Sequence, residues 1–447
     1  MPTAALPDEE TAEAPPVRGA TRPLRRQLVT ALFAYLLTLV AAGFVVDWDT
    51  AKSKPPAEAT PSPTKAAPVQ ATPQRSPAPP VRDVIPSIPE VTDVAQLDPV
   101  RQQSRVTARD NGQSVRYGDR SVWIFADTGL KSPDAFLSNT AVSTDDLNAA
   151  DGITLTGADL AGTSGDLHDE FLPWSAAERA FEKKHAKGCI PGGDDEYCGV
   201  TFGLWPGPVI ADPARQRVLV FYQKLCRGGA DGGPCSGEFG QDLGTGIAAV
   251  DMRTFQTTRL TPRNTLPVQS IEGRDSALFF SAETMYSSAA VVAGDDVYVY
   301  GNCTDDSRCR VARVPLADIT DRSAWRFYGG RDDDRTPLWV TDPLDAVPTI
   351  RAGAAGNSVT WNPALKAWLN VYSEFGEFEV RAQVGGSPYG PWSDSFTLAE
   401  TERPSHGMNY AAFTHPEYAE QNGLVQYVTY YQQVTGGLHL LRVTLSP

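Results

Sequence analysis

The sequence predicts an all-β protein, a five-bladed β-propeller preceded by one transmembrane helix and a disordered Pro-rich linker. Three observations support this: an apolar segment near the N-terminus, a Pro-rich stretch after it, and a strand–turn–strand pattern that recurs through the remaining chain. The expected boundaries are a cytoplasmic tail over residues 1–27, the helix over 28–46, the linker over 47–95 and the propeller over 96–447.

The segment Leu28–Val46 contains 19 residues without a charge, about the length that a helix needs to cross a bilayer. Four arginines precede it and two aspartates follow it, so the positive-inside rule predicts that the C-terminal bulk is exported. A cleaved signal peptide is the alternative, although the apolar run is longer than a usual h-region. The sequence therefore predicts a single-pass protein of the cell membrane with an extracytoplasmic C-terminal domain.

The linker is defined by its composition. Eleven prolines stand between Pro55 and Pro89, together with many Ala, Thr and Ser residues. Such a segment cannot bury enough apolar surface to fold, and its prolines favour an extended, semi-rigid chain. We expect the linker to hold the propeller away from the membrane.

Six cysteines support export, because disulfides persist in oxidising compartments. They form three close pairs within Gly- and Asp-rich loops, and each pair is expected to close its own loop. Zinc binding is the alternative, but the spacings are not those of zinc sites, so we expect no metal. The predicted disulfides join Cys189 to Cys198, Cys226 to Cys235, and Cys303 to Cys309.

The repeat consists of an apolar hexad that ends in a polar residue and follows a shorter strand and a turn. Each copy predicts the inner hairpin of one propeller blade, with outer strands after it. A β-sandwich is the alternative, but five hairpins over more than 300 residues exceed a typical sandwich. One helix is expected, over Pro173–Gly188. The five hexads are Val122–Asp127, Val218–Gln223, Val297–Asn302, Trp368–Ser373 and Tyr427–Gln432.

The first hairpin carries two aspartates that are candidates for catalysis. Asp110 stands about eight residues before the turn and Asp127 about eight after it, so antiparallel pairing brings both carboxylates to the same end of the hairpin. Among the five hexads, only the first ends in an aspartate. Two carboxylates with separated pKa values are what glycoside hydrolysis requires. The alternative is that both aspartates only form turns or cap the strand.

Further candidates for substrate binding come from the ends of the hexads and from nearby loops, where a propeller binds its ligands. A tyrosine could stack on a sugar, and amides and a carboxylate could bind its hydroxyls. Burial in a blade core is the alternative for the tyrosine, and a solvated loop position for the carboxylate. These candidates are Gln223, Tyr286, Asn302 and Glu374.

The blocks "RDNGQSVRYGDRSVWIFADT", "MYSSAAVVAGDDVYVYGN" and "SVTWNPALKAWLNVYSE" resemble a family of actinobacterial exported propellers, a domain of unknown function. Some members of that family are endo-D-arabinanases. The resemblance covers roughly residues 100–445 and implies a five-bladed propeller that cleaves cell-wall D-arabinan, with Asp110 and Asp127 as the catalytic pair. The chain departs from the family pattern at Asn111 and Ala126, where glycine is common, which leaves room for a different sugar or for lost activity.

The expected function is that of a membrane-anchored, extracytoplasmic glycoside hydrolase that acts on a cell-wall furanoside polysaccharide. The alternatives are a non-catalytic propeller that binds wall glycan or an exported protein, and a sensor with a short cytoplasmic tail. The net charge of −15 argues against nucleic acid as a partner. No phosphate-binding loop or H-E-x-x-H motif is present, so we expect no cofactor. We expect a monomer.

Overall fold

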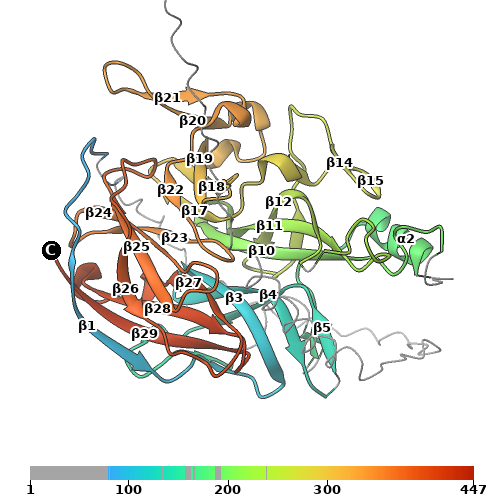
Figure 1. Cartoon of the computed structure of the whole chain (residues 1–447), viewed down its shortest axis with the longest axis horizontal. Helices are drawn as coiled ribbons and strands as arrows, with labels where there is room; N and C mark the ends of the chain where they lie inside the picture. Colours follow the sequence, from blue (N-terminus) through green and yellow to red (C-terminus); the bar gives the residue numbers. More distant parts are fainter. Residues whose placement is uncertain are drawn as a thin grey trace, which may run out of the picture. The chain divides into compact units, whose positions relative to one another are not determined.

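The computed structural model describes residues 79, 81–132, 134–156, 163–164, 167–186, 193–237 and 239–447. All of them belong to one compact unit, Ala71–Pro447. Five antiparallel sheets account for most of this unit, and each begins with an innermost strand. These innermost strands contact one another in a closed ring, so the unit is a five-bladed β-propeller (Figure 1). The predicted fold class is confirmed for the described residues. In chain order around the ring, the innermost strands are β3, β10, β17, β23 and β27.

The blades differ in how far they are elaborated. Blade four has four strands in simple sequence order, whereas blade two and blade three each carry an additional strand on their third strand. In blade one, β5 and β6 share β4 as their partner.

The strands of blade one are β3 (Val106–Tyr117), β4 (Arg120–Leu130), β5 (Ala135–Leu137) and β6 (Thr140–Thr144). Those of blade two are β10 (Thr201–Asp212), β11 (Arg217–Arg227), β12 (Gln241–Asp251), β13 (Thr257–Arg259) and β16 (Leu278–Ser281). Those of blade three are β17 (Ala289–Ala293), β18 (Asp296–Gly301), β19 (Arg308–Pro315), β20 (Arg326–Arg331), β21 (Pro337–Val340) and β22 (Ile350–Arg351). Those of blade four are β23 (Ser358–Asn362), β24 (Ala367–Tyr372), β25 (Glu379–Gly385) and β26 (Phe396–Glu400). Those of blade five are β27 (Asn409–Thr414), β28 (Val425–Gln432), β29 (Gly437–Ser446) and β1 (Glu90–Leu97).

Smaller elements decorate the blades. Two of the three short strand pairs are antiparallel and one is parallel. The pairs are β2 (Arg101–Gln102) with β7 (Thr154–Leu155), β8 (Thr163–Ser164) with β9 (Leu167–His168), and β14 (Val268–Ser270) with β15 (Gly273–Asp275). The 3₁₀ turns are Pro213–Arg215, Ala282–Thr284, Leu316–Asp318, Arg322–Ala324, Pro343–Asp345, Pro416–Tyr418 and Gln421–Gly423.

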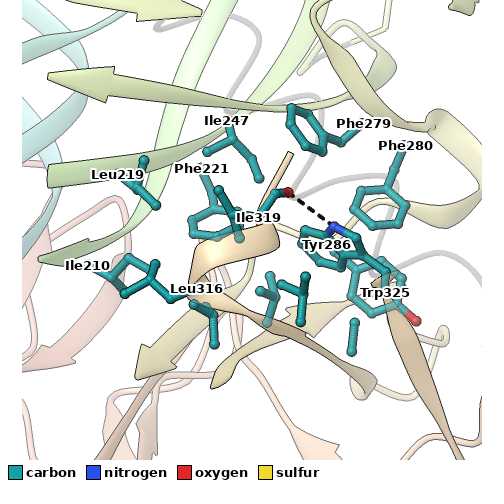
Figure 2. Close-up of a cluster of buried hydrophobic side chains, with 14 of the residues drawn as sticks. Ile210, Leu219, Phe221, Ile247, Phe279, Phe280, Tyr286, Leu316, Ile319 and Trp325 are labelled. Atoms are coloured by element: carbon teal, nitrogen blue, oxygen red, sulfur yellow. Dashed lines mark hydrogen bonds between the residues drawn. The ribbon is translucent and has the colours of Figure 1, made fainter. Parts of the chain in front are cut away.

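All five predicted hexads fall on the second strand of a blade, on β4, β11, β18, β24 and β28, and only the last residues of two of them, Asn302 and Ser373, stand one position beyond the strand. These strands are buried on both faces because they pack between neighbouring blades, which explains why the hexads are nearly continuous in apolar residues. A separate hydrophobic cluster fills each interface between blades. Figure 2 shows the cluster between blades two and three, where Phe221, Phe280 and Trp325 pack together.

Tyr286 belongs to this same cluster and is 1% exposed. Its ring lies 5.0 Å from that of Phe280 and 5.4 Å from that of Phe327, measured between centroids. A ring enclosed in this way has no face free for a sugar. The prediction that Tyr286 binds substrate is therefore wrong, because the tyrosine contributes to the packing of blades two and three.

The ring is closed by the N-terminal strand. β1 pairs antiparallel with β29 and so becomes the outermost strand of the blade that the C-terminus builds (Figure 1, β1 in blue beside β29 in red). Ahead of β1, the Arg82 amide donates to the Gly386 carbonyl, and Asp83 pairs with Arg331 at 2.7 Å. The linker predicted for residues 47–95 therefore ends too late, since the folded unit includes residues before 95.

Replacing Glu90–Leu97 by a Gly/Ser segment of equal length is expected to destabilise the propeller by roughly 3–5 kcal/mol. The change removes the ladder with β29 and exposes an unpaired strand edge. Calorimetry of the full chain measures this as a lower Tm. Val94→Thr, at a position of β1 that is 40% exposed, is the control and should leave Tm nearly unchanged. An unchanged Tm in the segment replacement contradicts closure by β1.

The predicted transmembrane segment Leu28–Val46 lies outside the described residues, so its prediction stays untested. Among the helices of the described part of the chain, none has the length and apolar character needed to span a bilayer. Two of the predicted disulfides are confirmed, Cys226–Cys235 and Cys303–Cys309. Cys198 is also disulfide-bonded, but its expected partner Cys189 lies outside the described residues.

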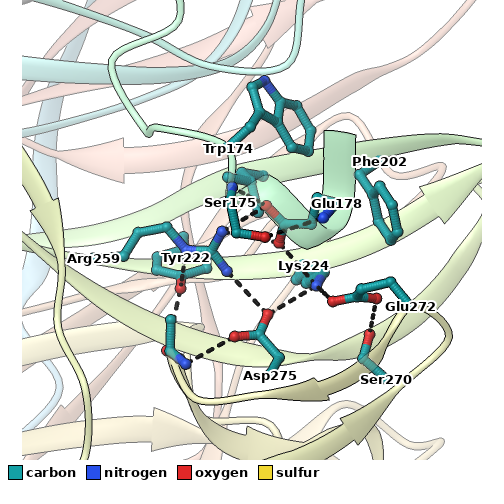
Figure 3. A network of polar contacts seen from close by, with 12 residues as sticks. Trp174, Ser175, Glu178, Phe202, Tyr222, Lys224, Arg259, Ser270, Glu272 and Asp275 are labelled. Carbon is teal, nitrogen blue, oxygen red and sulfur yellow. Dashed lines mark hydrogen bonds and ion pairs between the residues drawn. The ribbon is translucent and has the colours of Figure 1, made fainter. Parts of the chain in front are cut away.

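The predicted helix forms over a shorter range, as α2 (Ala176–His185). Ser175 caps its start and Glu178 completes a capping box, which fixes where the helix begins. Glu178 also enters a buried ionic network with Lys224 of β11 and Arg259 of β13, which attaches α2 to blade two (Figure 3). Glu272 and Asp275 from the β14–β15 region contact the same lysine.

Candidate active site

Asp110 lies on β3 and Asp127 on β4, within the ladder of blade one. Arg109 pairs with Thr128 and Asn111 with Phe125, so Asp110 stands opposite both Ala126 and Asp127 at an irregularity in the ladder. The structure thus brings the two carboxylates together at one end of the hairpin, as its geometry predicts, and their charges interact.

Irregular backbone surrounds the pair. Asn111 has a φ of 69° and donates from Nδ2 to the Pro206 carbonyl of β10 at 2.6 Å. The ladder of β27 with β28 is also interrupted between Tyr410 and Phe413, where the buried Ala411 has a φ of 56°. Bulges and left-handed residues bend a strand and redirect its side chains, and they concentrate at functional sites. The ladder of β10 with β11 also shifts between Pro206 and Val209, so blades one, two and five each carry an irregularity beside the aspartate pair.

Asp127 is held by two residues of blade two. Arg227 of β11 forms a bidentate ion pair with its carboxylate, with N–O distances of 2.8 and 3.1 Å. Trp205 of β10 donates from Nε1 to Oδ1 at 2.8 Å. The Arg227 guanidinium also lies 5.4 Å from the ring centroids of Trp205 and of the exposed Phe136. These donors fix the orientation of the carboxylate and stabilise its ionised form.

Asp110 has a different environment. Its Oδ2 accepts a hydrogen bond from the Tyr410 hydroxyl of β27 at 2.8 Å. Its Oδ1 is buried and has no hydrogen-bond partner of normal geometry. The ring of Tyr431 packs edge-on against that of Tyr410, with centroids 5.0 Å apart. The Asp110 carboxyl is therefore held by blade five through Tyr410, and its second oxygen lies in the protein interior.

The two environments shift the pKa values of Asp110 and Asp127 to different extents. Burial, followed by the negative charge of Asp127, raises the pKa of Asp110 to about 7, although the Tyr410 hydrogen bond, a backbone hydrogen bond from Asp127 and the Arg227 charge oppose the shift. Burial also raises the pKa of Asp127, but the Arg227 charge and the hydrogen bonds from Arg227 and Trp205 oppose it. Near neutral pH we therefore assign the shared proton to Asp110 and the negative charge to Asp127.

The other predicted substrate-binding residues do not gather around this pair. Gln223 pairs with Trp205 across the β10–β11 ladder, and its side chain donates a hydrogen bond to Asp242. Asn302 accepts from Arg310 through its carbonyl and lies in a left-handed turn of blade three. Glu374 lines a separate cavity that blades three and four form.

Sequence reasoning missed Tyr410 and Arg227 as members of the site. Arg227 is the last residue of β11 and stands four residues after the end of the predicted hexad. A prediction that extended this strand to its full length would have indicated Arg227 as a residue near the site. Tyr410 is the second residue of β27, the innermost strand of blade five, which adjoins blade one only because the ring closes.

One acidic cluster resembles a metal site but is occupied by the protein itself. Glu178, Glu272 and Asp275 bring their carboxylate oxygens within 4.8 Å of one another. Lys224 Nζ lies among them, 2.8 Å from both Glu178 and Asp275. The ammonium group and Arg259 compensate the acidic charge, so the cluster is an internal ion network rather than a cation site (Figure 3).

Comparisons with known proteins give the following. Residues 250–438 match a family described as a domain of unknown function, DUF4185. That range runs from the end of β12 into β29, so it contains Tyr410 but neither Asp110 nor Asp127. No curated protein matches the chain significantly.

Several solved structures are similar to this chain at low identity. A Bacteroides ovatus protein, described provisionally as a hydrolase, is 12% identical with a TM-score of 0.47, over 77% of this chain and 87% of its own. The GH43_1 enzyme of Xanthomonas citri in complex with xylotriose is 13% identical with a TM-score of 0.42, over 77% and 88%. A Dyadobacter fermentans protein of unknown function is 8% identical with a TM-score of 0.40, over 80% and 99%.

Proposed function

We propose that this protein is a glycoside hydrolase in which Asp110 is the general acid and Asp127 the carboxylate that acts on the anomeric carbon. The observation that carries the proposal is the pair itself: two carboxylates on one hairpin whose surroundings separate their pKa values. Glycoside hydrolysis needs one carboxyl group that keeps its proton at working pH and a second that is ionised.

The roles follow from the contacts of each side chain. Asp110 has a pKa raised to about 7, so it keeps its proton up to neutral pH and can donate it to the leaving glycosidic oxygen. Asp127, fixed by Arg227 and Trp205, either attacks the anomeric carbon or activates water. The separation of the carboxyls while substrate is bound distinguishes the two: roughly 5 Å corresponds to retention and 6.5–9.5 Å to inversion.

For the substrate we propose a neutral cell-wall furanoside polysaccharide, D-arabinan in particular, cleaved at internal linkages. Three points support this: the resemblance of the sequence blocks to exported propellers with endo-D-arabinanase members, the match of residues 250–438 to a domain of unknown function, and disulfides typical of exported proteins. We propose that the protein acts as a monomer, without a cofactor, outside the cytoplasm, anchored in the cell membrane by the helix predicted for residues 28–46.

The test is incubation of the full-length protein with purified arabinan and measurement of new reducing ends and product sizes. A mixture of oligosaccharides is expected from internal cleavage. If wild type and Asp127→Asn are equally inert on arabinan and on related glycans, the hydrolase proposal fails. Binding of arabinan without hydrolysis would support the alternative function, a propeller that recognises wall glycan without cleaving it.

The hydrolysis rate is expected to fall as the pH rises through about 7, because the general acid must keep its proton and the pKa of Asp110 is raised to about 7. The Tyr410 hydroxyl stabilises ionised Asp110, so Tyr410→Phe should raise that pKa and move the alkaline limb to higher pH. Profiles of kcat/KM between about pH 5 and pH 9 measure both effects.

Tyr427→Phe is the control for this profile, since that hydroxyl donates to Glu420 and does not contact the aspartates. Its alkaline limb should coincide with that of wild type. An alkaline limb in Tyr410→Phe that stays in place, or that moves to lower pH, contradicts the assignment of Asp110 as the acid.

A further inference from the structure

Blades three and four line a half-open cavity of about 480 Å³ that the catalytic proposal does not use. Its walls come from β19 and β22 of blade three and, in blade four, from β25, the loop after β24 and the loop between β25 and β26. The lining is almost entirely polar and carries charges of both signs. The residues that matter here are Arg308, Arg351, Arg381, Glu374, Gln383 and Asp394.

This cavity opens at the same end of the propeller as the aspartate pair. The second strand of every blade runs antiparallel to its innermost strand, so β4 and β24 both end on the side where Asp127 lies. Glu374 stands two residues beyond the end of β24. Its neighbour Ser373 accepts a hydrogen bond from the Ala412 amide at 3.2 Å, within the bulge of β27 that carries Tyr410. This hydrogen bond connects the loop that carries Glu374 to the strand that carries Tyr410.

Two exposed aromatic rings lie on loops of blades two and four and contact each other. Phe375 follows Glu374 directly and is 60% exposed. Phe239, in the loop after β11 that contains Cys235, is 58% exposed, and its ring centroid lies 6.4 Å from that of Phe375 in an edge-to-face arrangement. The two loops belong to blades two and four, which are not neighbours in the ring. The pair therefore joins the blade that supplies Arg227 to the blade that supplies Glu374.

The charges in the cavity favour a neutral ligand over an anion. Arg308 already pairs with Asp306 and Arg381 with Glu379, at 2.8 and 3.2 Å. Glu374 and Asp394 would repel an added negative charge. Hydroxyl groups suit this lining, because each can accept from a guanidinium and donate to a carboxylate. Exposed aromatic rings next to such a lining offer apolar faces to the C–H surfaces of sugar rings.

We propose that this cavity and the Phe239–Phe375 pair form a distal carbohydrate site, which holds part of a neutral polysaccharide away from the bond to be cleaved. The inference deepens the proposed function, on which it rests for the role of the bound chain in hydrolysis. A long substrate would run from Asp127 past the aromatic pair into the cavity, whereas a short oligosaccharide would occupy only the catalytic end.

The test compares Phe375→Ala and Arg381→Ala in the full-length protein with wild type on arabinan and on an arabinose trisaccharide. In both variants the ratio of kcat/KM for the polymer to kcat/KM for the trisaccharide is expected to fall about tenfold, which is the upper range for one lost aromatic or charged contact. The control for Phe375→Ala is Leu266→Ala, since Leu266 is an apolar residue that is 76% exposed. The control for Arg381→Ala is Arg442→Ala, since the side chains of both arginines are 30% exposed and Arg442 pairs with Asp93. A ratio in the two variants that equals that of the controls overturns the distal site.

Binding separates this inference from the proposed function. All variants are made in the Asp127→Asn background, and calorimetric titration measures their affinity for arabinan. Phe375→Ala and Arg381→Ala are expected to bind arabinan more weakly than their controls do. Anionic polygalacturonate is expected to bind more weakly than arabinan. If wild type hydrolyses nothing while these variants lose arabinan binding, the distal site stands and the hydrolase proposal fails. Tighter binding of polygalacturonate than of arabinan overturns the assignment of a neutral ligand.

Discussion

Asp127→Asn is expected to lower kcat/KM for arabinan by a factor on the order of a thousand or more, since loss of a group that acts on the reacting carbon removes stabilisation of the transition state. The amide has nearly the same shape, but it cannot carry the negative charge that Arg227 and Trp205 orient. Release of reducing ends measures the rate, and thermal unfolding checks the fold. Because Arg227 is partly exposed, the fold should tolerate the lost ion pair.

The control for this change is Asp251→Asn, at the opposite end of blade two. Asp251 is the half-buried last residue of β12 and accepts hydrogen bonds from Arg253, and its replacement should leave hydrolysis near the wild-type rate. Equal loss of activity in Asp251→Asn and Asp127→Asn would mean that the effect is structural. Full activity in Asp127→Asn would exclude this residue from the chemistry.

Asp110→Asn should abolish hydrolysis as well, and it should also stabilise the fold in a pH-dependent manner. The folded-state pKa of Asp110 is raised to about 7 by burial and by Asp127, so the wild-type fold loses stability as the pH rises from the ordinary aspartate range through about 7. Asparagine has no proton to lose. The gain in Tm over wild type should therefore be larger at about pH 8 than at about pH 5. An equal gain at both values contradicts the raised pKa.

Lys224→Ala is expected to destabilise the protein by about 3–5 kcal/mol, the usual consequence of leaving buried charges without their partner. Three carboxylates from α2 and the β14–β15 region face this ammonium group, and all of them are nearly inaccessible to solvent. Arg259 still pairs with Glu178 and Asp275, but it cannot compensate three acids (Figure 3). Chemical denaturation at neutral pH measures the loss. The control is Lys183→Ala, which removes an exposed lysine of α2.

The sign of the pH dependence provides a second check on Lys224. Burial alone would raise the pKa of Glu178 and of Asp275, but the positive charges of Arg259 and Lys224 reverse this and hold both pKa values below their usual range. Acids with lowered pKa values stabilise the fold above their unfolded pKa, and that contribution is lost as the pH falls through the folded one. The difference between wild type and Lys224→Ala should therefore shrink toward about pH 4. A difference that grows at acid pH would contradict the network.

Local patterns in the sequence were sufficient for much of the fold. The hexads have a run of apolar residues long enough for one strand, and turn residues stand before each of them, so five inner hairpins could be predicted. The start of α2 follows from Ser175 and Glu178, which satisfy each other's backbone amides. Cysteines that are close in sequence could be paired, since few partners are within reach.

Contacts between distant segments were not predictable in the same way. β1 follows a Pro-rich stretch and is largely exposed on one face, so nothing local distinguishes it from linker; it is a strand because β29 offers an unpaired edge. Tyr286 carries the same aromatic ring that a sugar site would use, and only the packing of blades two and three decides that it is buried.

The sequence by itself determined the blade hairpins and, through their antiparallel geometry, that Asp110 and Asp127 share one end of the first of them. Those facts depend on residues close together in the chain, where strand period and turn chemistry act directly. Only the tertiary structure decided what surrounds the pair. Tyr410, Trp205 and Arg227 belong to other blades and reach the aspartates because the ring closes and three strands bulge. Burial and charge at that junction then raise the pKa of Asp110, and these depend on neighbours that no local pattern specifies.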